Sequence, residues 1–232
     1  MQYPEYPYER EASSSSFMAR VYGWMSFALA ITALVAYYVH KTPALYTPLR
    51  TSPWLLIGVI VFQFILVFVL STFILKMNYF VSLLLFALYS VSVGVTFSFV
   101  FAVYTKSSIY STFLVAAGMF FITSLYGYFT KADLTRLGSF AFMALVGLIL
   151  AIFVNWFLKS PIFSFVLSIA GVIIFTALTA FDVQKIKDMG SRLSILPEMR
   201  KRVAILGSLR LYLDFINLFL FLLRLMGRQR ED

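Results

Sequence analysis

The chain has 232 residues, of which 61% are apolar, only 12% are charged, and 26 are phenylalanine. A soluble domain carries roughly 45–50% apolar and about 25% charged residues, so this composition excludes an ordinary soluble protein. There is one histidine, His40, and no cysteine. The chain therefore has no disulfide framework and no thiolate nucleophile, and typical zinc-hydrolase and Ser-His-Asp sites are not expected.

Residues 1–16 are polar and rich in proline and serine, which predicts a short disordered N-terminal tail. Residues 17–232 are predicted to form one all-α transmembrane domain, because seven apolar runs are each long enough to cross a bilayer. The runs must be helices, since backbone groups in lipid need partners within their own segment. The spans are expected at 21–39, 54–75, 79–103, 109–129, 138–158, 161–183 and 204–226.

The net charge of +9 follows from membrane topology and does not predict a nucleic-acid partner. Most Lys and Arg residues lie in the connections between spans or near the chain ends. Of the 19, eleven are on the N-terminal side of the membrane, seven are on the other side, and Arg210 lies inside the last span. Such a bias favours the cytoplasm for the richer side. We therefore expect the N-terminus inside and the C-terminus outside, in contact with membrane lipid.

Two aspartates interrupt the last two spans. Asp214 lies about ten residues into the last span, roughly 15 Å deep, and Asp182 lies near the inner end of span six. A charge at mid-bilayer costs at least ~2.5–3.5 kcal/mol, so it usually faces a cavity or a partner. The basic loop between the two spans makes them antiparallel, and with the N-terminus inside both carboxylates are predicted on the cytoplasmic side of the midplane. If they meet, they share a proton and form a pH-sensitive oxygen cluster.

Helical spacing adds other polar groups to these faces. The last span aligns Arg210, Asp214, Asn217 and Phe221, and span six aligns Thr179, Asp182 and Lys185. An alternative interpretation is a pair of static salt bridges within these helices, Asp214 with Arg210 and Asp182 with Lys185. Arg210 can also extend to the inner membrane surface.

One glutamine and several glycines within the spans are expected to have structural roles. Gln63, near the middle of span two, is a possible modulator, but a hydrogen bond between helices is the more typical role for such a residue. Glycines within the spans are expected to allow close helix packing, and we single out Gly94, Gly118, Gly147 and Gly171.

Several stretches resemble one family. They are "LYLDFINLFLFLLRLMG" at 211–227, "FTALTAFDVQKIKDM" at 175–189, "AAGMFFITSLYGYFTKADLTRLGSFAFMALVGLILAIFVNWFL" at 116–158 and "LYSVSVGVTFSFVFAVY" at 88–104. On these motifs the chain is identified as a member of the Bax inhibitor-1 family, in its bacterial branch, and the resemblance covers nearly everything after residue 17.

The resemblance implies six helices around a central seventh, and a pH-sensitive calcium leak across the bacterial inner membrane. It implies that Asp182 and Asp214 form the sensor, which closes a monomeric pore when the two share a proton. Ca²⁺ prefers carboxylate and carbonyl oxygens, so both aspartates are candidate contacts for the transported ion. No enzymatic activity and no cofactor are expected.

The sequence departs from the family at two places. The aspartate of span six usually has Tyr before it and Thr after it, where this chain has Phe181 and Val183. In many relatives span two carries an arginine that latches the sensor, near the position of Phe73. We expect Arg210 to take over part of that role.

Two other functions stay open from the sequence. The family resemblance permits a regulator that binds other membrane proteins, such as a quality-control protease or cell-death factors. An intramembrane aspartyl protease also needs two aspartates on adjacent helices, but the Gly-x-Gly-Asp and Pro-Ala-Leu motifs are missing here.

Overall fold

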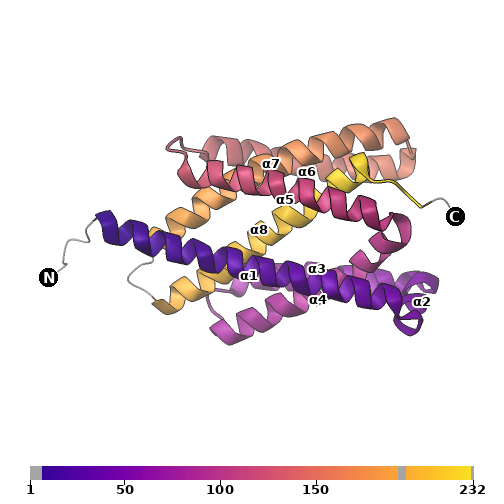
Figure 1. Ribbon diagram of the computed structural model, residues 1–232, viewed down its shortest axis with the longest axis horizontal. Helices are drawn as coiled ribbons and strands as arrows, with labels where there is room; N and C mark the ends of the chain where they lie inside the picture. Colours follow the sequence, from indigo (N-terminus) through magenta and orange to yellow (C-terminus); the bar gives the residue numbers. More distant parts are fainter. Residues whose placement is uncertain (1–6, 193–196, 231–232) are drawn as a thin grey trace. The chain divides into compact units, whose positions relative to one another are not determined.

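The computed structural model describes residues 7–192 and 197–230. In these ranges the chain is helical throughout, with short connections and no strand, as Figure 1 shows. Seven of the helices are long and apolar enough to cross a membrane, which confirms the predicted all-α, seven-span architecture. The helices are α1 (Pro7–Lys41), α2 (Pro43–Thr51), α3 (Pro53–Phe73), α4 (Tyr79–Val103), α5 (Lys106–Phe129), α6 (Thr135–Leu158), α7 (Pro161–Arg192) and α8 (Pro197–Met226).

Three helices extend beyond the predicted spans. Helix α1 begins at Pro7, inside the segment predicted as a tail, and residues 1–6 lie outside the described ranges. Helix α7 continues to Arg192 and α8 already begins at Pro197. Apolar patterning ends where the membrane ends, but Lys, Arg, Gln and Glu are good helix formers, so a helix continues into water.

Helix α2 lies in the first connection, which the sequence predicts only as a break between spans. Pro43 fits the first turn, where its missing N–H is not needed, but Pro48 lies inside the helix and argues against one. Aromatic contacts hold α2 in place: the Tyr46 ring lies 5.6 Å from His40 and 5.4 Å from Phe99, measured between centroids. The contact with Phe99 joins segments far apart in sequence, which explains why local patterning misses the helix.

The chain divides into two compact units, which are described separately. The first comprises residues 1–103 and 186–212, and the second comprises residues 104–185 and 213–232. Helices α1–α4, the last turns of α7 and the first half of α8 therefore belong to the first unit. Helices α5 and α6, most of α7 and the second half of α8 belong to the second.

In the first unit, α1 and α4 approach closely at Gly94. A Cβ atom at this position would lie 2.7 Å from Cβ of Val35 and 2.9 Å from the carbonyl oxygen of Thr32. The same level of the helix pair carries a buried polar contact, because the Thr32 hydroxyl lies 3.0 Å from the carbonyl oxygen of Ser90. The glycine therefore brings the backbones close enough for this contact.

Tyr212 joins α8 to that helix pair. Its hydroxyl lies 2.7 Å from Thr32 Oγ1, and its ring packs edge-on against Phe86 and Tyr89 with centroids 5.9 Å apart. The single Thr32 hydrogen serves a carbonyl acceptor, so Tyr212 donates and Thr32 accepts. A fully buried tyrosine hydroxyl thus has a partner, as an apolar interior requires.

In the second unit, glycines bring α5 and α6 against α7. A Cβ on Gly127 would strike the carbonyl group of Ala180, and one on Gly138 would strike the Phe181 ring. The expectation of close packing holds for Gly94 and for Gly171, which faces the ring of Phe221. It is wrong for Gly118 and Gly147, which have open space around them, because spacing alone does not say which face of a helix has a neighbour.

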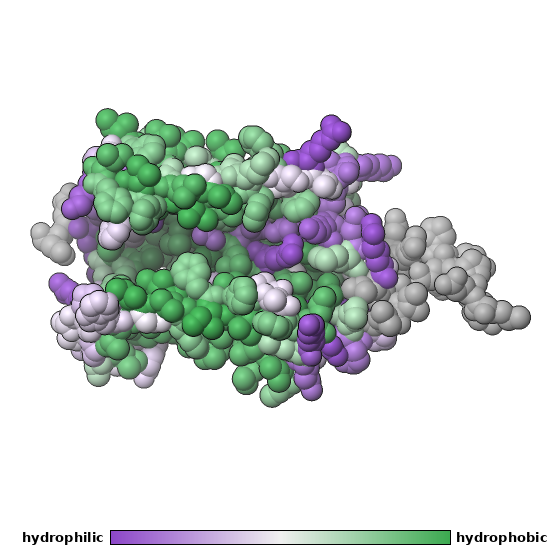
Figure 2. All heavy atoms as spheres, turned by 180° about the vertical axis from the view of Figure 1, so that it is seen from behind, coloured by the Kyte–Doolittle hydropathy of each residue, from purple (hydrophilic) through white to green (hydrophobic). Residues whose placement is uncertain are grey.

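Helix α8 is the most buried of the spans: 78% of its most apolar stretch is buried, against 11–39% in the other six. The other spans instead expose large apolar side chains, such as Trp54, Phe80 and Ile162, and apolar residues cover most of the face seen in Figure 2. Such a surface suits lipid. The arrangement of six helices around α8 stays a prediction.

Candidate functional site

Both candidate sensor residues lie in the second unit. Asp214 of α8 is buried, with only 5% of its surface exposed, and Asp182 of α7 is half-buried. Among the described residues, no group of three or more His, Cys, Asp or Glu side chains comes together. Within the seven spans predicted from the sequence, Asp182 and Asp214 are the only acidic residues.

Contacts at two levels fix the direction in which α7 and α8 run past each other. Phe175 of α7 stacks on Phe221 of α8, with ring centroids 5.8 Å apart and planes 26° apart. Further along α7, Ile186 lies against Gly207, where a Cβ atom would be 2.9 Å from Ile186 Cγ2. Residue numbers rise in one helix as they fall in the other, so the helices are antiparallel.

The aspartates have matching positions relative to the aromatic pair. Asp182 follows Phe175 by seven residues, and Asp214 precedes Phe221 by seven residues. Seven residues are about two helical turns and about 10.5 Å, so each aspartate shares a helix face with its phenylalanine. In antiparallel helices both displacements run in the same direction, which favours a common depth and facing carboxylates.

The segment of α7 around Asp182 is held on several sides. Gly127 of α5 leaves room for the Ala180 carbonyl, and Gly138 of α6 leaves room for the Phe181 ring. The ammonium group of Lys185 lies over the same ring, 5.2 Å from its centroid, a distance typical of a cation–π contact. These contacts restrict the backbone on either side of the carboxylate.

Gln184 is a site residue that the sequence reasoning missed. Its Nε2 donates to the carbonyl oxygen of Ala132 at 2.8 Å, and its Oε1 accepts from the backbone N–H of Leu134 at 2.9 Å. The amide thus joins α7 to the α5–α6 connection, two residues after Asp182. Both partners are backbone groups, so no pattern of side chains in the sequence signals the contact.

Asp133 organises the same connection. Its Oδ1 accepts hydrogen bonds from the backbone N–H of Thr135 at 2.9 Å and from the Thr135 hydroxyl at 2.6 Å. The Thr135 side-chain bond, and after it the backbone bond, lower the pKa of Asp133 below its usual value. The carboxylate therefore stays charged at neutral pH and fixes the first turn of α6.

Three side chains predicted to modulate the sensor donate hydrogen bonds to backbone carbonyl groups. The Thr179 hydroxyl donates to the Phe175 carbonyl at 2.7 Å, and Asn217 Nδ2 donates to the Leu213 carbonyl at 2.8 Å, each within its own helix. In the first unit, Gln63 of α3 donates to the Ser92 carbonyl of α4 at 2.8 Å, which is the interhelical bond typical of such a residue.

Arg202 and Arg210 of α8 both lie in the first unit. Arg210 is half-buried in α8, four residues before Asp214 in sequence. Helix α3 ends at Phe73 and supplies no cation of its own. Instead Arg202 of α8 donates from Nη1 to the carbonyl oxygen of Leu75 at 2.8 Å. An arginine therefore does contact the end of span two, but it comes from α8.

Comparison with known proteins decides the family. The sequence profile described as "Inhibitor of apoptosis-promoting Bax1" matches residues 14–231. The chain belongs to the Bax inhibitor-1 family. Among similar proteins, the inner membrane protein YbhL of Escherichia coli (strain K12) is 48% identical over 94% of both chains.

More distant relatives span nearly the whole chain as well. A protein of Borreliella burgdorferi is 43% identical over 94% of both chains. One of Deinococcus radiodurans is 38% identical over 93% of this chain and 91% of its own. The membership, the seven apolar helices and the relative's location make the chain an integral inner membrane protein.

Proposed function

We propose that this Bax inhibitor-1 family member is a pH-sensitive calcium leak channel of the inner membrane, with Asp182 and Asp214 as its proton sensor. One observation carries the sensor assignment: the two aspartates stand two turns from the stacked Phe175–Phe221 pair, in the same direction. The charge distribution favours an N-terminus inside and a C-terminus outside.

The mechanism follows from the charge of a carboxylate pair. When both groups are ionised, they repel each other and offer oxygens to a passing Ca²⁺ ion. When one proton is shared, a negative charge disappears and an O–H···O⁻ hydrogen bond ties α7 to α8. The leak therefore decreases as pH falls through the titration of the pair.

The burial of Asp214 strengthens this coupling. Charges in a low-dielectric interior interact more strongly than charges in water, so one proton has a large effect on a pair of helices. On the α7 side, the glycine contacts at Ala180 and Phe181 and the Gln184 bonds hold the backbone near Asp182. Because α7 is held in place, the helix movement that opens or closes the pore is made by other elements.

The test is calcium flux into liposomes that contain the purified protein, measured between about pH 5 and pH 8, the range over which a carboxylate pair that shares a proton can titrate. The parent should leak less at low pH, and Asp182→Asn and Asp214→Asn should each flatten this dependence. Asp133→Asn is the matched control, because its carboxylate is fully exposed and outside the spans. A full pH response in both single variants would reject the sensor, and no flux in the parent would reject the channel.

A further inference from the structure

Cationic side chains gather around the first turns of α8 in the first unit. We define the cationic cluster as Arg20 of α1, Lys76 after α3, and Arg200 and Arg202 of α8. Arg20 and Lys76 are exposed, and the two α8 arginines are half-buried. Hydrophilic residues are prominent toward this end of the face seen in Figure 2.

Specific contacts hold the two α8 arginines. The guanidinium carbon of Arg200 lies 5.4 Å from the centroid of the Phe17 ring, and that buried ring packs over Gly190 of α7. Arg202 bonds to the carbonyl of Leu75, next to Lys76. The guanidinium groups are therefore positioned by the fold, which reduces the ordering cost of binding an anion.

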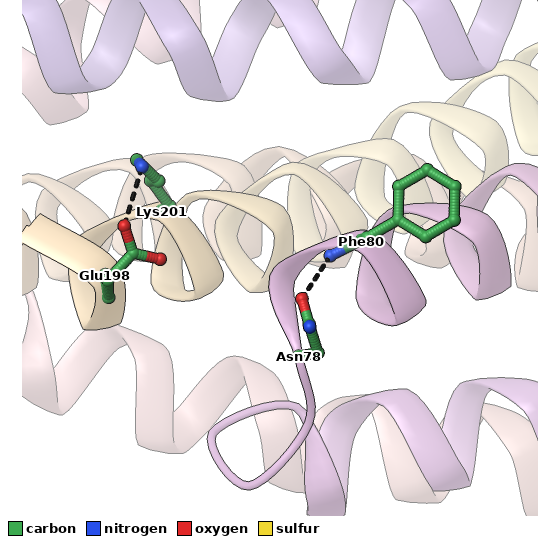
Figure 3. Close-up of polar contacts among 4 residues, drawn as sticks. All are labelled: Asn78, Phe80, Glu198 and Lys201. Atoms are coloured by element: carbon green, nitrogen blue, oxygen red, sulfur yellow. Dashed lines mark hydrogen bonds and ion pairs between the residues drawn. The ribbon is translucent and has the colours of Figure 1, made fainter.

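The cluster brings like charges together. Arg20 lies close enough to Arg200 for their positive charges to repel. Glu198, the acid in the first turn of α8, accepts from Lys201 at 2.7 Å, as Figure 3 shows, and its charge also attracts Arg202. The neutral Asn78, just before α4, accepts from the Phe80 N–H at 3.0 Å (Figure 3). An added anion would relieve the repulsion.

Apolar side chains lie beside the cations along the chain. Phe73 and Leu75 precede Lys76, Phe80 follows it, and 41%, 46% and 68% of their surfaces are exposed. Charge and apolar surface thus adjoin at the end of a membrane span. A free phosphate ion would use only the first of these features, whereas a phospholipid would use both.

We propose that the cationic cluster binds the phosphate headgroup of an anionic phospholipid, whose acyl chains lie along the exposed side chains of Phe73, Leu75 and Phe80. Arginine suits this role because its planar group donates two parallel hydrogen bonds to phosphate oxygens. Lipid binding at this cluster requires no calcium flux, so this proposal is tested independently of the proposed channel function.

Trp24 provides a reporter, because it follows Arg20 by one turn of α1. The full chain with Trp54→Phe and Trp156→Phe is placed in bilayers that contain brominated phosphatidylglycerol or brominated phosphatidylcholine at equal mole fraction. Bromine quenches tryptophan at short range, so the anionic lipid should quench Trp24 more strongly. The preference for phosphatidylglycerol should fall about fivefold for each of Arg200→Gln and Arg202→Gln.

A matched control separates a site from general surface charge. Lys131→Gln/Arg136→Gln removes two positive charges, one from the α5–α6 connection and one from the first turn of α6, and should leave the preference unchanged. The proposal is overturned by equal quenching from both lipids in the parent, by an unchanged preference in Arg200→Gln/Arg202→Gln, or by an equal loss in the control. If Arg200→Gln/Arg202→Gln does not fold, the same quenching comparison is made between the parent and Arg20→Gln. An unchanged preference for phosphatidylglycerol in Arg20→Gln then overturns the proposal.

Discussion

Phe175 of α7 and Phe221 of α8 stack with ring centroids 5.8 Å apart, and each ring lies two helical turns from an aspartate. The stacked pair is a common reference point for the two aspartates, because equal displacements from it along antiparallel helices lead to the same depth. Gly171 lies beneath the Phe221 ring, so the stack has a defined position along α7.

Asp182→Cys/Asp214→Cys should form an oxidative cross-link, because a disulfide needs Cβ atoms about 3.5–4.5 Å apart. The parent contains no cysteine, so no competing thiol interferes. Trypsin cuts the basic segment between the two positions, and a cross-link keeps the fragments together on a non-reducing gel. Val183→Cys/Asp214→Cys is the control, since residue 183 points away from the face of Asp182. Equal cross-linking of both pairs would contradict the facing arrangement.

Gln184→Leu should loosen the α5–α6 connection. The variant leaves the Ala132 carbonyl and the Leu134 N–H without their amide partner, at a cost of about 1–3 kcal/mol. We expect a lower unfolding temperature in detergent and faster tryptic cleavage at Lys131. Gln63→Leu removes an interhelical bond of the first unit and should destabilise without exposing Lys131. Faster cleavage at Lys131 in Gln63→Leu as well would argue for a general loss of structure.

Thr32→Val and Tyr212→Phe should differ in cost although they break the same hydrogen bond. Tyr212→Phe removes the donor and leaves the Thr32 hydroxyl with its acceptor, the Ser90 carbonyl, at about 1 kcal/mol. Thr32→Val buries the Tyr212 hydroxyl without an acceptor and should cost about 1–3 kcal/mol. Denaturation in detergent checks the order, and the double variant should cost less than the sum. Additive effects would mean that the hydroxyls do not interact.

Glycine substitutions should separate close contacts from open positions. Gly127→Ala places a methyl group against the Ala180 carbonyl and should destabilise by about 1–3 kcal/mol. Gly118→Ala in the same helix meets open space and should be neutral or stabilising by up to about 1 kcal/mol. Thermal unfolding of the two variants provides the comparison. Similar losses in both would contradict the close approach of α5 to α7.

Arg210→Gln should shift the pH midpoint of the leak upward. A positive charge one turn before Asp214 favours the ionised carboxylate, so its removal lets the pair gain its proton at higher pH. We expect a shift of about 0.3 pH units for a pair at this spacing. Flux measured against pH in liposomes gives the midpoint, and Arg224→Gln, near the end of α8, is the control. An unchanged midpoint in folded protein would mean that Arg210 extends to the membrane surface instead.

Some elements follow from sequence because their cause is local. Seven apolar runs determine seven helices, since a chain in lipid must satisfy its own backbone groups. The motifs around Asp182 and Asp214 likewise determine the family, now shown by the match over residues 14–231. The ends of α7 and α8 are less predictable, because helix formers continue a helix after the membrane pattern stops.

The remaining features depend on contacts between distant segments. Sequence spacing does not distinguish Gly127, which meets Ala180, from Gly118, which meets nothing, because it does not say where a neighbouring helix lies. It does not reveal the Gln184 bonds or the contact of Arg202 with Leu75, because those partners are backbone groups. The sequence by itself thus determined the spans, the family and the two acids within the last two spans. Only the tertiary structure decided which helix faces meet, because packing selects among faces that local chemistry leaves equivalent.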